Sequence, residues 1–399
     1  FKTIYEETVK NSDFGYELVS NNLKEDLWMW YNNELYYYKF PKEDIKTYLE
    51  TNSIRSIFEL DTNDFIISTD FNCWFKLNTL TEEVSQFNPI INNNTLKPES
   101  SRNIIKVNDS IIWSNHKSSL LRTNLKNLKS EKFSHFPVIC LEKPNDSLLI
   151  YGTQNYNLMS FNINTKTHKS LLKTDSLYIY DIEIKKNSSL VVAGTDKGLL
   201  VYNFKTKKHK FYNNKNQLKD TFILMCDYHK DYGYLLGTRS GYIIGFNPKN
   251  ESFKTLYKDN LNAGIASILF DNDLWWINTF NGVVSFNPNN KTSSRFSINE
   301  GLSNNEANRY SALKTKNNTF FVGTLTGLNV FKPKNLKLKK DNAVLVLLNV
   351  KKYDNTLKKY TSNLDRSTLD FNQSIVLPSE NRALELHFAL KNSKTIAEN

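Results

Sequence analysis

The sequence has few cysteines, glycines and prolines, and it has no long apolar run. Its 399 residues include 3 Cys, 13 Gly and 9 Pro. Cys73, Cys140 and Cys226 are odd in number and far apart, which excludes a disulfide framework or a CxxC metal pair and predicts small buried residues. The longest apolar stretch, about Ala343 to Leu348, is far too short to cross a membrane. A cross-linked or membrane-spanning scaffold is therefore excluded for this chain.

Catalytic signatures are missing as well. The sequence contains no HExxH, GxSxG, P-loop or GxGxxG motif, and its six histidines show no metal-ligand spacing. Carboxylate pairs such as Asp271 and Asp273 fall in predicted hairpin turns, where Asp is expected for backbone hydrogen bonding. We therefore expect no catalytic residue, no metal, no cofactor and no enzyme activity in this chain. The sequence starts at Phe1, without an initiator methionine and without a signal-peptide pattern. We therefore expect a mature or excised fragment.

Aromatic residues and positive charge are abundant. The 25 Phe and 21 Tyr suit the pleated, half-buried surfaces of β-sheets. The net charge of +11 is compatible with nucleic acid, anionic lipid or acidic polysaccharide as a partner. The lysines are scattered, however, and the one compact block, Lys332 to Lys340, falls in a predicted linker. A solvated surface is therefore the favoured reading, and we expect no direct binding of nucleic acid.

A repeat of roughly 40 residues runs along the chain. Its clearest copy, Asn318 to Phe331, reads as a strand ending in Gly323-Thr324, a turn closed by Gly327, and a second strand ending in an aromatic residue. Close copies surround Gly194-Thr195 and Gly237-Thr238, and looser ones lie further upstream. The threonine position falls at residues 31, 69, 115, 153, 195, 238, 279 and 324.

Each copy reads as one four-stranded blade of a β-propeller. An apolar strand precedes the Gly-Thr signature, and a polar segment follows the aromatic residue, as in Lys207 to Tyr212. Polar outer strands keep sheet edges from pairing with other chains, and the 3.6-residue periodicity of a helical solenoid is absent. The sequence thus predicts an all-β chain whose propeller has seven or eight blades.

The blade count and the closure of the ring depend on the first residues. Eight units are present, but seven is a common ring number and is slightly favoured, in which case residues 1–40 belong to a preceding blade or ring. The last unit lacks its polar outer strand, whereas residues 1–10 look like such a strand without a unit before it. We therefore expect residues 1–10 to complete the last blade.

A second domain follows the propeller. We assign residues 1–335 to the propeller, 336–342 to a linker, and 343–399 to the start of an immunoglobulin-like sandwich. Predicted strands of this sandwich are Ala343 to Tyr353, Ser374 to Leu377, and Ala383 to Leu390. Alternating apolar residues in the last segment are typical of a half-buried strand.

These units resemble the propeller repeats of bacterial two-component regulators. In that family a strand ends in Trp-x-Gly-Thr and the loop between blades reads Asp-Gly-Leu-Ser-Asn. This chain has Leu274 to Thr279 (LWWINT) at the strand and Glu300 to Asn305 (EGLSNN) at the loop. Leu377 to Leu390 is similar to the opening of the three-tyrosine (Y_Y_Y) domain that follows these propellers. The early blades lack the Gly-Thr signature, so their ligand loops do not align.

The resemblance implies a periplasmic sensor region of a hybrid histidine kinase or a related one-component transcription regulator, often one that controls polysaccharide use. It further implies an oligosaccharide ligand and a homodimer that rearranges to signal, with kinase activity and the membrane helix residing outside this chain. Two rivals remain open. One is a structural or protein-interaction propeller, and the other is a propeller lyase or hydrolase with a polar cluster in the central channel.

The repeat register also locates a ligand-binding face. Ligands of propellers usually meet the loops between the second and third strands and the loops between blades. In this chain that face is expected to include Arg239, Phe280, Asn281, Asn305, Glu306 and Arg309. The tryptophans Trp28, Trp30, Trp113, Trp275 and Trp276 lie in repeat strands, where packing between blades is favoured over sugar stacking.

Overall fold

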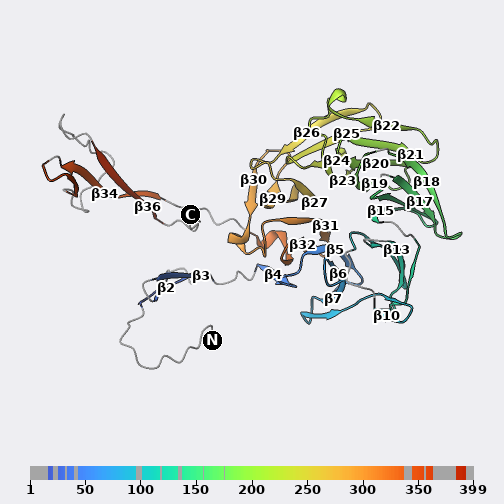
Figure 1. The fold of residues 1–399 in the computed structure, drawn as a ribbon, viewed down its shortest axis with the longest axis horizontal. Helices are drawn as coiled ribbons and strands as arrows, with labels where there is room; N and C mark the ends of the chain where they lie inside the picture. The colour runs from blue at the N-terminus through green and yellow to red at the C-terminus, as the bar shows by residue number, and fades with distance from the viewer. Residues whose placement is uncertain are drawn as a thin grey trace. The chain divides into compact units, whose positions relative to one another are not determined.

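The computed structural model is an all-β structure with two compact units, Phe1–Leu336 and Lys337–Asn399. It describes residues 17–20, 26–31, 34–39, 44–95, 101–116, 119–133, 137–155, 157–174, 176–336, 344–354, 356–362 and 383–391. The larger unit contains seven four-stranded antiparallel sheets that follow one another round a ring, and each sheet is one blade (Figure 1). The predicted propeller is therefore confirmed, with seven blades.

The first four blades follow the chain in order. Blade 1 comprises β5 (Ile54–Glu59), β6 (Asp64–Thr69), β7 (Trp74–Asn78) and β8 (Glu83–Gln86). Blade 2 comprises β11 (Ile104–Asn108), β12 (Ile111–His116), β13 (Ser119–Asn124) and β14 (Ser130–Lys132). Blade 3 comprises β15 (Val138–Asn145), β16 (Leu148–Thr153), β17 (Asn157–Asn162) and β18 (Thr167–Lys173). Blade 4 comprises β19 (Ile179–Glu183), β20 (Leu190–Thr195), β21 (Leu199–Asn203) and β22 (His209–Tyr212).

The last three blades complete the ring. Blade 5 comprises β23 (Ile223–His229), β24 (Gly233–Thr238), β25 (Tyr242–Asn247) and β26 (Ser252–Lys258). Blade 6 comprises β27 (Ile265–Asp271), β28 (Leu274–Thr279), β29 (Gly282–Phe286) and β30 (Ser293–Phe296). Blade 7 comprises β31 (Ala307–Lys314), β32 (Phe320–Thr324), β33 (Gly327–Phe331) and β4 (Ile45–Tyr48). Small additions are the pair β9 (Ile90–Ile91) and β10 (Asn94–Thr95), and the 3-10 turns η1 (Asn214–Asn216), η2 (Ile298–Glu300) and η3 (Pro333–Asn335).

The strand that closes the ring is β4, which pairs antiparallel with β33. Ile45 lies opposite Phe331, and Tyr48 lies opposite Leu328. The prediction that residues 1–10 fill this place is wrong, and those residues lie outside the described part of the chain. The error has a simple cause: residues 45–48 read equally well as the polar outer strand of the unit around Tyr31.

The unit around Tyr31 is not one of the seven blades. Its strands β1 (Glu17–Ser20), β2 (Asp26–Tyr31) and β3 (Glu34–Lys39) form their own antiparallel sheet with β2 in the centre. The first three strands of this eighth unit thus stay together, while the fourth joins blade 7. Eight units in the sequence therefore yield seven closed blades.

The Gly-Thr signature has a local physical cause. The Thr195 hydroxyl donates to the carbonyl of Gly198 at 2.8 Å, and Thr324 donates in the same way to Gly327 at 2.9 Å. These bonds close the turn between the second and third strands. Gly198 and Gly327 have φ angles of +154° and +131°, in a region that side chains disfavour. Both the hydroxyl and the second glycine are therefore needed to form the turn.

The first glycine of the signature allows neighbouring blades to pack closely. A Cβ atom at Gly194 would lie 2.6 Å from Cγ2 of Ile223, the first residue of β23 in the next blade. At Gly323 the same atom would lie 2.7 Å from Ile54, across the joint between blades 7 and 1. The repeat glycine therefore marks the contact between blades.

Replacing Gly194 by valine is expected to lower the free energy of unfolding by about 1–3 kcal/mol, because the added side chain overpacks this contact. Urea denaturation followed by tryptophan fluorescence measures the change. Thr255→Val, at an exposed position of β26, is the matched control and should leave the midpoint in place. An unchanged midpoint for Gly194→Val would contradict the assigned role of the glycine.

The interior of the ring follows the predicted pattern. Trp113, Trp275 and Trp276 are buried at 1–2% exposure and pack against residues of a neighbouring blade, which confirms packing between blades as their role. Trp113 packs against Phe133 and Phe161. The three cysteines are buried, as expected. Trp28 and Trp30 lie in β2, of whose side chains nothing is described.

The smaller unit contains one antiparallel sheet. Its order is β35 (Lys359–Ser362), β34 (Val344–Asp354) and β36 (Leu384–Lys391). The expected strands at Ala343 to Tyr353 and Ala383 to Leu390 are thereby confirmed. The expected strand at Ser374 to Leu377 lies outside the described residues. None of the helices in the described residues is long and apolar enough to cross a membrane.

Candidate ligand-binding site

An enlarged β-bulge in blade 7 aims two side chains at the centre of the ring. In five other blades the first strand has a single-residue register shift near its start, as between Ile179 and Asp181. In β31 the shift runs from Ala307 to Ala312, so the bulge gains further residues, including Arg309 and Tyr310. Bulges of this kind often re-aim side chains at functional sites.

Tyr310 crosses the central channel. Its backbone has φ +64°, a strained conformation for a bulky residue. The hydroxyl donates a hydrogen bond to the carbonyl of Tyr180 in blade 4, on the far side of the ring. Burial raises the pKa of this phenol, although the nearby charge of Arg309 opposes the shift, so the phenol keeps its proton and remains a donor. The bulge therefore places a polar bar across the mouth of the channel.

Three aromatic rings line the mouth next to this bar, and we call Tyr178, Tyr180 and Phe222 the aromatic row. The rings of Tyr178 and Tyr180 are 4.7 Å apart, and those of Tyr180 and Phe222 are 5.1 Å apart. Two arginines contact the row: Arg309 lies 4.7 Å from the central ring of Tyr180, and Arg239 lies 5.1 Å from that of Phe222 at one end. Two predicted site residues thus meet at one surface.

A cavity of about 260 Å³ adjoins the aromatic row and shares Tyr178 with it. Arg102 and Gln154 supply polar groups to its wall, and Phe71 is 75% exposed at its rim. Its acidic wall residue, Asp70, is occupied by Arg55 at 2.6 Å and by the Ser53 hydroxyl at 2.6 Å. The complete lining is Asp70, Phe71, Arg102, Asn115, Pro137, Val138, Ile139, Gln154 and Tyr178.

The other predicted site residues mainly hold the loops of blades 6 and 7. Phe280 is partly buried against the core. The Asn305 side chain accepts a hydrogen bond from the Ile298 amide at 2.9 Å, and its carbonyl accepts one from Gly282 at 2.6 Å. Glu306 and Asn281 are exposed. The role of these four residues in binding stays a prediction.

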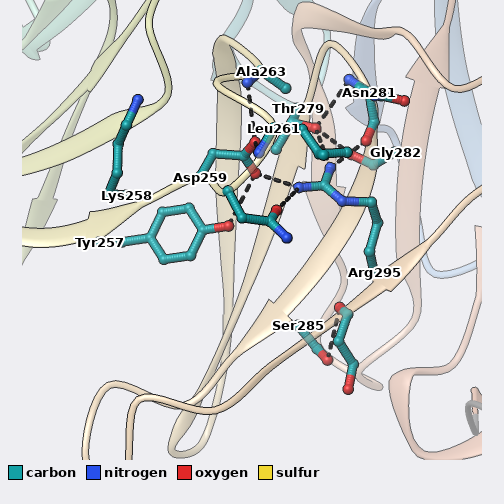
Figure 2. A network of polar contacts seen from close by, with 12 residues as sticks. Tyr257, Lys258, Asp259, Leu261, Ala263, Thr279, Asn281, Gly282, Ser285 and Arg295 are labelled. Carbon is teal, nitrogen blue, oxygen red and sulfur yellow. Dashed lines mark hydrogen bonds and ion pairs between the residues drawn. The ribbon is translucent and has the colours of Figure 1, made fainter.

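A buried ion pair fixes the loop between blades 5 and 6 (Figure 2). The carboxylate of Asp259 has 0% exposure and contacts the Arg295 guanidinium. It also accepts hydrogen bonds from the amides of Leu261 and Ala263 and from the Tyr257 hydroxyl, at 2.9, 3.0 and 3.0 Å. Burial alone would raise the pKa of Asp259, but these bonds and Arg295 hold it below its usual value. The carboxylate therefore stays ionised and fixes this loop.

Four carboxyl groups lie deeper in the ring, and we call Glu142, Asp181, Glu183 and Asp227 the channel carboxyls. They come from the first strands of blades 3, 4 and 5. Desolvation, reinforced by repulsion among them, raises the pKa of Glu142 to about 8 and that of Glu183 to about 9. Desolvation also raises the pKa of Asp181 to about 7 and that of Asp227 to about 6. At neutral pH Glu142 and Glu183 are thus mainly protonated, whereas Asp227 is mainly ionised.

Sequence reasoning found Arg239 and Arg309 but missed the aromatic row, Arg102 and the channel carboxyls. The sequence shows that Tyr178 and Tyr180 are two residues apart, but the contact of Tyr180 with Arg309 depends on the bulge in β31. The channel carboxyls had a usable signal. Glu142, Glu183 and Asp227 occupy one position of three successive repeats, each opposite the residue two before the Gly-Thr glycine.

A larger cavity of about 410 Å³ lies at the opposite ends of the strands, between blades 7 and 1. Tyr48, Phe65 and Phe321 line it together with residues of the turns that connect first and second strands. It is remote from the aromatic row. We place the candidate site at the smaller cavity because that one joins the aromatic row to Arg102. Among the described residues, no cluster of His, Cys, Asp and Glu could hold a metal ion.

The fold is that of a seven-bladed β-propeller, and the chain is similar to several known proteins in sequence or in structure. The curated histidine kinase P4 of Formosa agariphila is 24% identical over 332 residues, which cover 76% of this chain and 24% of that protein. This chain thus spans about a quarter of that relative. A search of protein-family profiles gives no match.

Solved structures of similar fold include extracellular domains of putative hybrid two-component systems from B. thetaiotaomicron. One has a TM-score of 0.67 and 14% identity, covering 95% of this chain and 53% of that one. Another has a TM-score of 0.61 and 17% identity, covering 77% and 41%. The Cps50 (Swd1) propeller of Myceliophteria thermophila also matches, with a TM-score of 0.56, 12% identity, and coverage of 71% and 97%. At these identities the likeness shows the fold alone.

Proposed function

We propose that this chain is the extracytoplasmic ligand-sensing part of a signal-transduction regulator and that its ligand is an oligosaccharide. The observation that carries the proposal is the aromatic row beside a 260 Å³ cavity. Aromatic rings offer apolar faces on which sugar rings stack, while neighbouring polar groups fix orientation. The likeness to extracellular domains of two-component systems supports the sensing role.

Signalling in this proposal requires that binding favours one arrangement of two copies over another. A ligand shifts such an equilibrium only by its differential affinity for the two arrangements. The bar formed by Tyr310 links blade 7, into which the chain enters through β4, to blade 4 at the site. Analytical ultracentrifugation of the chain with and without ligand tests for a homodimer that changes its association.

Replacing Tyr180 by alanine is expected to weaken glycan binding by at least about tenfold, because one stacking face and the platform for Arg309 are lost. Titration calorimetry, with ligands first selected by thermal shift from a glycan panel, measures the change. Leu80→Ala, at an exposed turn far from the site, is the control and should bind normally. If no glycan shifts the melting temperature, the oligosaccharide proposal is overturned and a protein-interaction propeller is favoured.

A further inference from the structure

The arginines of the propeller fall into two groups. Arg55, Arg122 and Arg295 each contact a carboxylate, namely Asp70, Glu131 and Asp259. Arg102, Arg239 and Arg309 contact no carboxylate within the described part of the chain. The three unpaired arginines all border the aromatic row or its cavity. The arginines without a carboxylate partner are therefore concentrated at the candidate site.

Arg309 is the strongest member of this group. Its Nη1 atom is inaccessible to solvent and has no hydrogen-bond partner among the described residues. A buried donor without a partner is costly, and a charged donor more so. The strained bulge nevertheless holds Arg309 against the ring of Tyr180. Arg309 as a whole is only partly buried, and a site that holds a guanidinium group with an unmet donor is suited to an acceptor supplied from outside.

The surroundings compensate this charge only in part. Asp181 is the channel carboxyl that interacts with Arg309 electrostatically, and desolvation raises its pKa to about 7. Asp70, the acid nearest to Arg102 in the cavity wall, is already bonded to Arg55 and Ser53. Among the described residues, neither Arg102 nor Arg309 therefore forms an ion pair at the mouth. Guanidinium binds carboxylate and sulfate oxygens in a planar, two-pronged geometry.

We propose that the ligand is an acidic oligosaccharide, with a carboxylate or sulfate group bound by Arg309 and Arg102 while its sugar rings stack on Tyr178 and Tyr180. Arg239, at the far end of the aromatic row, binds a second acidic group along the same chain. This inference rests on the proposed function and adds the charge of the ligand to it. The surface alternates aromatic rings with arginine side chains. This order suits a polysaccharide chain that carries both apolar sugar faces and acidic substituents.

The decisive experiment compares matched ligands. Calorimetry is run with oligogalacturonate, with the same oligomer after reduction of its carboxylates to alcohols, and with a sulfated galactan and its desulfated form. We expect at least about tenfold tighter binding of one acidic form than of its neutral partner, equal to about 1.4 kcal/mol. The advantage should shrink at about 0.5 M salt. The two pairs separate a carboxylate ligand from a sulfate ligand.

Three variants locate the effect. Arg309→Gln, Arg102→Gln and Arg239→Gln should each remove most of the preference for the acidic form, whereas Arg122→Gln, at an ion pair on outer strands of blade 2, should keep it. Melting temperatures check that each variant folds. The exposed Arg239 provides a test even if the bulge variant is unstable.

The outcomes separate the two proposals. Tight binding of a neutral glycan that depends on Tyr180 but not on the arginines would overturn the acidic ligand and leave the sensing role intact. Binding of no glycan in either form would overturn both. Equal binding of single-stranded oligonucleotides that requires the same arginines would identify a general polyanion site and overturn the saccharide assignment.

Discussion

Replacing Asp259 by alanine is expected to lower the free energy of unfolding by about 3–5 kcal/mol, the usual cost of removing one partner of a buried ion pair. The carboxylate has 0% exposure, and its loss removes the charged partner of Arg295 and leaves two backbone amides without their acceptor (Figure 2). Urea denaturation at neutral pH measures the effect. Because the bonds fix the loop between blades 5 and 6, the folded variant should also show faster amide exchange at 259–264.

A double-mutant cycle identifies the interaction. If Asp259 and Arg295 act on each other, the Asp259→Ala and Arg295→Met costs should add to more than the cost of the double variant. Asp109→Ala removes an exposed ion pair with Lys106 and should leave the denaturation midpoint unchanged. Strict additivity of the two single changes would contradict a direct Asp259–Arg295 interaction.

The channel carboxyls are expected to make the protein lose stability as pH rises from about 5 to about 9. Their folded pKa values, about 8 for Glu142 and about 9 for Glu183, lie above those of the unfolded chain. The folded state therefore binds more protons in this window, and stability falls with increasing pH. One pKa unit corresponds to about 1.4 kcal/mol, so we expect a total loss of at least about 2 kcal/mol.

Glu183→Gln tests the source of this dependence. The amide keeps the shape of the protonated acid, so the variant should match the parent near pH 5 and exceed its stability by about 1–2 kcal/mol near pH 9. Glu83→Gln, at an exposed position of β8, should leave the slope unchanged. Identical pH profiles for Glu183→Gln and the parent would place the titrating groups elsewhere.

The sequence predicts the blades well because their signature arises from local physics. The Thr195 hydroxyl and Gly198, only three positions apart, close the turn between them, so the pattern repeats wherever the turn does. The glycine before the threonine is needed because the next blade packs closely against it. This contact between blades recurs as regularly as the turn. Strand order and outer polarity follow from the same period.

The site was only half predictable because it is assembled across the ring. Tyr180 and Arg309 meet although they lie far apart in sequence, and their contact depends on a bulge that enlarges one strand. No local pattern signals how many residues a bulge holds. The prediction of the closing strand was wrong for a related reason. Residues 45–48 suit the edge of either of two sheets, and closure of the ring determines which sheet they join.

Closure by β4 has a mechanical consequence. The chain enters the ring at Ile45 and leaves it after Phe331, and these residues face each other at one end of the β4–β33 pair. A pull that separates the two flanking segments would peel this pair one hydrogen bond at a time instead of loading all bonds together. Blade 7, which also carries Arg309, is therefore expected to open before the other blades under tension.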